Sequence, residues 1–227
     1  MGVHGDANMV TALAKSCNVY FAELGRRLGA EALKDWANKF GVGTQTGIEI
    51  SESKGVVAGP EHSEKVGAKW YESGSSQAAI GQSDNMITPI QMATYVATIA
   101  NNGKRGRTHL VKKITDYSRN NIVREFGFEP AGIVNIAPED LNVVKQGMRE
   151  VALSGTARDF ANYPIQIAAK TGTAQNSGSD HTTFVCFAPY DDPQIAISVV
   201  IAHGKYGTAS KNVARDIMNC YFEIPSK

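Results

Sequence analysis

Two apolar stretches near the C-terminal end of the chain, residues 181–189 and 194–202, constrain its fold more than any other feature. In the second stretch apolar residues occupy both the odd and the even positions, so both faces of a strand formed there are apolar. This pattern is typical of a central strand that is covered on both faces. The intervening Tyr190-Asp191-Asp192-Pro193 has the composition of a turn, which predicts that the two strands form an antiparallel hairpin.

Helical periodicity in the rest of the chain predicts the elements that cover this sheet. The expected helices are residues 9–28 (interrupted at Gly25 and Gly29), 31–40, 88–101, 138–154 and 209–222. Irregular structure is expected over residues 41–87, and short extended segments over residues 108–136 and 165–169. Helices followed by a short antiparallel sheet and a last helix predict the α+β class.

Length and charge exclude several functional classes. The 227 residues are ample for the hydrophobic core of one large domain or two small ones. The 23 basic and 22 acidic residues give a net charge of +1, without the clustered basic excess that is typical of a nucleic-acid-binding protein. No run of about 18 apolar residues occurs, so we expect no membrane-spanning helix in these residues.

The cysteine and histidine residues have no spacing that is typical of a metal site or a disulfide framework. The three cysteines, Cys17, Cys186 and Cys220, are each expected to be a small buried hydrophobic residue. The five histidines are scattered and lack the H-E-x-x-H spacing of a zinc site. We therefore expect no bound metal.

Two short segments carry residues suited to chemistry, Ser16-Cys17-Asn18 and Lys170-Thr171-Gly172. A lysine ammonium and threonine hydroxyls at the end of a strand can hold a substrate carboxylate, and a glycine lets a ligand approach the backbone closely. Ser16 and Asn18 can place a hydroxyl and an amide in one pocket if the first helix breaks between them. Each segment alone is common by chance.

The two segments together, in this order, resemble the S-x-N and K-T-G motifs of class B penicillin-binding proteins. The neighbouring sequence is also similar to that family, in the segments Ala79-Ile80-Gly81-Gln82, Ile87-Thr88-Pro89-Ile90-Gln91 and Ser154-Gly155-Thr156-Ala157. The resemblance covers essentially the whole chain. It implies the penicillin-binding protein/β-lactamase-like transpeptidase fold, an α+β fold in which helices flank an antiparallel sheet.

The family's first motif, the S-x-x-K that carries the nucleophilic serine, has no counterpart before Ser16. The one S-x-x-K string of the sequence, Ser51-Glu52-Ser53-Lys54, follows the S-x-N segment and lies where the family has an unrelated turn, so we do not expect it to hold the nucleophile. Residues 1–227 are expected to form a single partial transpeptidase domain that starts after the nucleophile helix, and to be inactive alone.

The resemblance implies an enzyme that cross-links peptidoglycan stem peptides ending in D-Ala-D-Ala through an acyl-serine intermediate, and that binds β-lactams without any cofactor. In this relationship Ser16 relays protons, Asn18 binds the substrate backbone amide, and Lys170 sets the positive potential of the cleft and hydrogen-bonds Ser16. Alternative interpretations are a β-lactamase or D,D-carboxypeptidase, and a non-catalytic penicillin-sensing module.

The same resemblance assigns substrate binding to the residues around the K-T-G motif. These residues are Thr171, Gly172, Thr173 and Gln175. The hydroxyls of Thr171 and Thr173 would take the terminal carboxylate, and the backbone N–H of Thr173 would donate to the oxyanion.

The family also suggests where the parent protein works and what it meets. We expect the extracytoplasmic face of a bacterial membrane, reached through an upstream anchor, and contacts with other proteins of cell-wall synthesis in division or elongation. No nucleic-acid partner is expected. The family pairs the 194–202 strand with one that precedes the nucleophile helix, so an open edge here predicts that the chain self-associates or binds its missing N-terminal piece.

Overall fold

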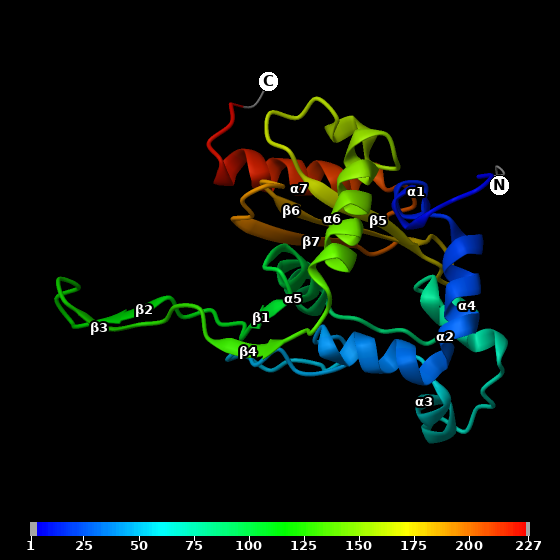
Figure 1. The fold of residues 1–227 in the computed structure, drawn as a ribbon. Coiled ribbons are helices and arrows are strands. Elements are labelled where there is room, and N and C mark those ends of the chain that lie inside the picture. Colours follow the sequence, from blue (N-terminus) through cyan, green and yellow to red (C-terminus); the bar gives the residue numbers. More distant parts are fainter. Residues whose placement is uncertain (1–3, 226–227) are drawn as a thin grey trace.

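The computed structural model describes residues 4–225, and an antiparallel sheet of three strands organises its C-terminal part (Figure 1). The strands are β5 (Ala168–Ala174), β6 (His181–Ala188) and β7 (Ile195–Ile201), in the order β5-β6-β7. The predicted hairpin of β6 and β7 is therefore confirmed. The prediction that the 194–202 strand is central was wrong for the described residues, because β7 lies at an edge and pairs only with β6.

Helices cover both faces of this sheet, so the predicted burial of the strand faces is confirmed. One face packs against α5 (Pro89–Ala100) and α6 (Pro138–Leu153), and the other packs against α7 (Thr208–Tyr221). Successive residues of β6 alternate between the two layers: Phe184 contributes to the α7 side and Val185 to the side of α5 and α6. Both side chains are buried.

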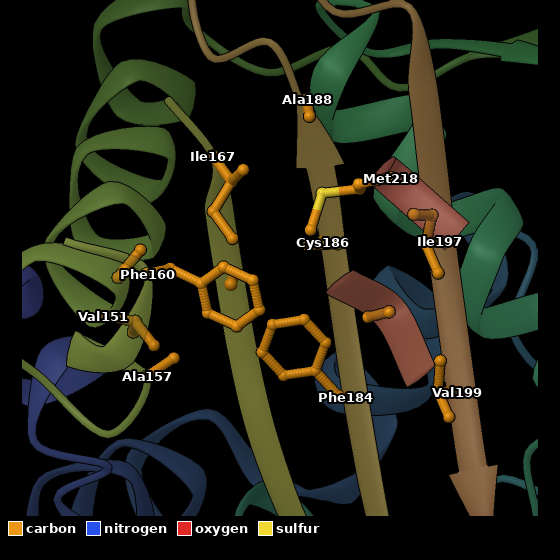
Figure 2. Packing of buried hydrophobic residues seen from close by; sticks show 13 residues of the cluster. Val151, Ala157, Phe160, Ile167, Phe184, Cys186, Ala188, Ile197, Val199 and Met218 are labelled. Carbon is orange, nitrogen blue, oxygen red and sulfur yellow. The ribbon is translucent and has the colours of Figure 1, made fainter. Parts of the chain in front are cut away.

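The larger core cluster lies between the sheet and α7, and Figure 2 shows its side chains pointing toward one another. The rings of Phe160 and Phe184 stack with centroids 5.5 Å apart. Phe160 comes from the short 3-10 helix η1 (Arg158–Phe160), and Met218 reaches the cluster from α7. Each of these three side chains is at most 1% exposed, so the cluster excludes water.

The N-terminal helices divide at a different place from the predicted one. Helix α1 (Met9–Ala14) ends before Ser16, and α2 (Asn18–Lys39) starts after Cys17. Gly29 does interrupt α2, with φ 76°. Gly25 does not, because it lies within the helix where a side chain would collide with α4 (Ser73–Ala79).

The segment expected to be irregular contains two short helices, α3 (Pro60–Lys65) and α4. Their sequences are weak signals, since α4 begins Ser-Gly-Ser-Ser. Packing of α4 against α2 stabilises a helix that its intrinsic propensity would not. An isolated bridge between Val56 and Met86 closes the remainder of the segment.

Helix α5 begins as predicted, at a capping box. The Thr88 hydroxyl accepts from the Gln91 N–H at 3.3 Å, and the Gln91 side chain accepts from the Thr88 N–H at 3.0 Å. Gln91 is buried and also donates to the carbonyls of Thr44 and Lys54. One side chain therefore starts α5 and holds two loop segments against it.

Two short ribbons are formed by residues 104–133; short strands were predicted over residues 108–136, so the first strand was missed. Strand β1 (Lys104–Gly106) pairs with β4 (Pro130–Ile133), and β2 (Lys113–Thr115) pairs with β3 (Ile122–Glu125). The β2–β3 ribbon projects away from the rest of the protein (Figure 1). Within residues 4–225, none of the helices is long and apolar enough to cross a membrane.

The prediction that the cysteines are buried is confirmed at two of the three positions. Cys17 and Cys186 are buried, and burial raises the pKa of Cys186 to about 12, so its thiol stays protonated. Cys220 is exposed near the end of α7, and its predicted burial was wrong because it stands beside, not on, the helix stripe formed by Ala214 and Met218.

Candidate functional site

The turn between α1 and α2 presents Ser16. Its backbone takes a left-handed conformation with φ 49°, and the Ser16 and Cys17 N–H groups close the end of α1 by donating to the Leu13 and Ala12 carbonyls. Cys17 is buried and acts as N-cap residue of α2, which leaves the side chain of Asn18 exposed on the first turn. The helix break needed to bring Ser16 and Asn18 to one side is therefore present.

Lys170 lies on β5 and reaches this turn. Its Nζ donates to the Ser16 Oγ at 2.6 Å and to the Thr171 carbonyl oxygen at 2.7 Å. The side chain is largely enclosed, and desolvation lowers the pKa of Lys170 to about 8. Among the residues that the structure describes, no carboxylate offsets this effect. The ammonium group is therefore held by neutral oxygens and is free to attract an anion.

A second contact joins β5 to the turn that precedes it. The hydroxyl oxygens of Thr156 and Thr171 lie 2.6 Å apart, and the Thr156 N–H donates to the Ala14 carbonyl at 3.2 Å. Thr156 thus connects the end of α1 with the K-T-G strand. The sequence indicated this turn only as a family landmark, and the positioning contact of Thr156 was missed.

The K-T-G segment lies within β5 and not beyond its end, which corrects the prediction of a short strand over residues 165–169. Gly172 pairs with Thr183 of β6, and a side chain at position 172 would collide with the Thr183 hydroxyl. The neighbouring strand therefore already requires a glycine here. Close approach of a ligand stays a prediction.

The remaining predicted substrate-binding residues are Thr173, near the end of β5, and Gln175, which follows the strand; both are exposed. Gln82 bonds to both of them: its Nε2 donates to the Thr173 carbonyl at 3.1 Å, and its Oε1 accepts from the Gln175 N–H at 3.4 Å. Sequence reasoning missed Gln82 as a site residue, although it ends the Ala79-Ile80-Gly81-Gln82 segment.

The S-x-x-K string lies in an exposed loop. Ser51 is exposed, and the Lys54 carbonyl accepts the hydrogen bond from Gln91 that was described above. Within residues 4–225 no hydrogen bond joins the side chains of Ser51 and Lys54, and no group of three or more metal-ligating side chains occurs.

The site therefore combines a serine hydroxyl, a lysine whose pKa burial lowers to about 8, and threonine hydroxyls along one strand. A lysine and a serine at 2.6 Å can exchange a proton, and the ammonium with nearby hydroxyls can bind a carboxylate. Asn18 starts α2 two residues after Ser16, with its side chain exposed.

Comparisons with known proteins match one protein family over nearly the whole chain. The sequence model of the penicillin binding protein transpeptidase domain matches residues 2–219. The peptidoglycan D,D-transpeptidase MrdA of Acinetobacter baumannii is 33% identical over 95% of this chain and 34% of its own length. The chain thus spans about a third of that relative.

Solved structures give the same result. The crystal structure of Pseudomonas aeruginosa PBP2 in complex with WCK 5153 superposes with a TM-score of 0.84 at 30% identity, covering 95% of this chain and 47% of that one. Helicobacter pylori PBP2, in its complex with MreC, superposes with a TM-score of 0.83 at 27% identity, covering 97% of this chain and 41% of that one.

Proposed function

The chain belongs to the penicillin-binding protein transpeptidase family, and from this premise we propose that it forms part of the catalytic domain of a peptidoglycan D,D-transpeptidase. The observation that carries the proposal is the hydrogen bond from Lys170 to Ser16, which joins the two family motifs. The substrate is a stem peptide ending in D-Ala-D-Ala, and a β-lactam competes for the same cleft.

Ser16, Asn18 and Lys170 have the catalytic roles in this proposal. A serine oxygen attacks the carbonyl carbon of the penultimate D-Ala, and the terminal D-Ala leaves as an amine after it receives a proton through Ser16. Lys170, at 2.6 Å from Ser16, stabilises the negative charge that develops and keeps the Ser16 hydroxyl oriented. Asn18, exposed beside them, binds a backbone amide of the substrate.

Residues of β5 bind the other parts of the substrate. The hydroxyls of Thr171 and Thr173 receive the terminal carboxylate, and the N–H of Thr173 donates to the oxyanion. Gly172 keeps this strand face open, and Gln175 bounds the cleft at the end of β5. The positive potential of Lys170, which no described carboxylate offsets, supports anion binding at this strand.

We place the nucleophilic serine outside residues 1–227, on an S-x-x-K segment of the parent protein. The exposed loop position of Ser51 supports this proposal, since a nucleophile needs a buried basic partner. The parent would act at the extracytoplasmic face of a bacterial membrane and meet other cell-wall synthesis proteins, as the H. pylori relative meets MreC.

Intact mass after exposure to a fluorescent penicillin tests the proposal. We expect no adduct on the 227-residue chain, and a stoichiometric adduct once an S-x-x-K segment of a relative is supplied in cis or as a separate chain. In the complemented protein Lys170→Ala or Asn18→Ala should slow acylation strongly, and the matched change Ser51→Ala should leave it unchanged. An adduct on Ser16 or Ser51 of the chain alone would contradict this assignment.

A further inference from the structure

Within residues 4–225, no strand pairs with the outer edge of β5. Strand β5 pairs with β6 on one side, and in an antiparallel ladder alternate residues direct their N–H and C=O groups to the opposite side. Thr171, Thr173 and Gln175 form one such alternate set. The Thr171 carbonyl accepts from Lys170 Nζ, and the Thr173 carbonyl accepts from Gln82 Nε2. Side chains therefore occupy this edge where another strand would otherwise pair.

The Gln82 side chain makes the two bonds that a peptide strand would make. Its Nε2 donates to the Thr173 carbonyl, and its Oε1 accepts from the Gln175 N–H two residues further on. A residue of a strand paired in parallel uses the same two partners, one carbonyl and the N–H two residues later, whereas a residue of an antiparallel strand bonds to both groups of one residue. The side-chain amide of Gln82 thus makes the two backbone hydrogen bonds that one residue of a parallel extended peptide would make.

The backbone that carries Gln82 is held in place, while the two hydrogen bonds of its half-buried side chain are exposed to solvent. The Gln82 N–H donates to the Gln77 carbonyl at 3.0 Å, and Asn85 Nδ2 donates to the Gln82 carbonyl at 3.0 Å. Asn85 is itself tied to α4 and to Ala58. The side chain can therefore rotate away from β5 without movement of the loop.

We propose that Gln82 competes with the substrate for the outer edge of β5: its amide occupies the Thr173 and Gln175 backbone groups in the free protein, and an extended peptide must displace it to pair there. This inference rests on the proposed function, because it assigns the peptide to the same cleft. It adds a specificity consequence. Ligands that form both backbone bonds can displace the amide, whereas ligands that form neither leave it in place.

Binding of a fluorescein-labelled stem pentapeptide ending in D-Ala-D-Ala, measured by anisotropy on the 227-residue chain, tests the proposal. Removal of two exposed, competing hydrogen bonds in Gln82→Ala should lower the Kd about fivefold. Gln82→Glu retains an acceptor for Gln175 but cannot donate to Thr173, so it should also bind more tightly. The matched control Gln166→Ala, at an exposed glutamine before β5, should bind as the unchanged protein does.

Hydrogen exchange gives a readout that does not need the peptide. The Gln175 amide should exchange several-fold faster in Gln82→Ala than in the unchanged protein, while the Val185 amide of β6 should not change. If the Gln175 amide exchanges equally fast in Gln82→Ala and in the unchanged protein, Gln82 does not compete for this edge. Pentapeptide binding by Gln82→Ala that is equal to or weaker than that of the unchanged protein would also overturn the competition. Neither result would contradict the peptide site itself. Failure of both proteins to bind the pentapeptide would overturn the peptide site and the competition together.

Discussion

The Nζ atom of Lys170 lies 2.6 Å from the Oγ atom of Ser16, although 154 positions separate the two residues in the sequence. The lysine belongs to the edge strand β5, and the serine belongs to the break between α1 and α2. The contact therefore joins the helical N-terminal region to the sheet. Its strength depends on the protonation of a lysine that burial has made less basic.

The stability of the protein should depend on pH through Lys170. Burial lowers the pKa of Lys170 from 10.5 to about 8, so between these values the folded chain has released a proton that the unfolded chain still binds. Stability then rises with pH across this window. Below pH 8 the buried charge carries its full penalty, about 3 to 4 kcal/mol for a pKa lowered by this much.

Urea unfolding of Lys170→Met checks this expectation. The variant has neither the desolvation penalty of the Lys170 ammonium nor its hydrogen bond to Ser16. Its free energy of unfolding minus that of the unchanged protein should therefore fall as the pH is raised from 7 to 10. Lys113→Met, at an exposed lysine of β2, serves as the control and should give no comparable trend. A pH-independent difference for Lys170→Met would show that the ammonium is not desolvated.

Gly172→Ala should destabilise the protein by about 1–3 kcal/mol, because the new methyl group would collide with the Thr183 hydroxyl on β6. Thr183→Ala removes that hydroxyl, so the double variant should be more stable than Gly172→Ala alone. Gly127→Ala, where no atom lies within 4 Å of the added carbon, should change stability by less than about 0.5 kcal/mol. Additive effects of the two changes in thermal unfolding would refute the steric explanation.

Phe184→Ala should cost about 3–5 kcal/mol, because it leaves a cavity in the cluster that Phe160 and Met218 share. Phe128→Ala is the matched control, since Phe128 is 60% exposed on the ribbon region and its loss should cost much less. Chemical denaturation of both variants measures the difference. Similar losses would mean that the sheet–α7 cluster is not the main core.

Much of the sheet could be predicted because its signals are local. The turn composition of residues 190–193 and the apolar alternation after it specify a hairpin without knowledge of the rest of the chain. The hydroxyl of Thr88 and the proline that follows it marked the start of α5 in the same way. Periodicity alone indicated a central position for β7, because strand order depends on partners; the open edge at β7 was predicted only from the family resemblance.

The site could be predicted as motifs but not as contacts. Ser16 ends α1 in a left-handed conformation that no glycine or proline signals, and the Thr156 bond to Ala14 supports that end from a distant turn. Gln82 meets Thr173 across 91 positions, and only the tertiary fold decides this meeting. Short helices such as α4 were missed because tertiary packing, not propensity, stabilises them.

Thr156 should position the hydroxyl of Thr171 for a substrate carboxylate. Thr156→Val removes the oxygen that lies 2.6 Å from Thr171 Oγ1 at nearly constant volume, so stem-pentapeptide binding should weaken about two- to tenfold. Thr156→Ser retains the hydroxyl and should restore the affinity. Equal affinities of the three proteins by fluorescence anisotropy would leave Thr156 with a structural role only.

The outer edge of β7 should make the chain self-associate. Within residues 4–225 this strand pairs only with β6, and an apolar strand with unpaired backbone groups recruits further strands. The weight-average mass from sedimentation should therefore rise above 24.4 kDa with concentration. Val200→Lys places a charge on the exposed part of β7 and should lower this association, whereas Val66→Lys, at an exposed valine beyond α3, should not. If the unchanged chain stays monomeric at every concentration, the edge of β7 is protected in solution. If Val200→Lys self-associates as strongly as the unchanged chain does, the contact lies on another surface.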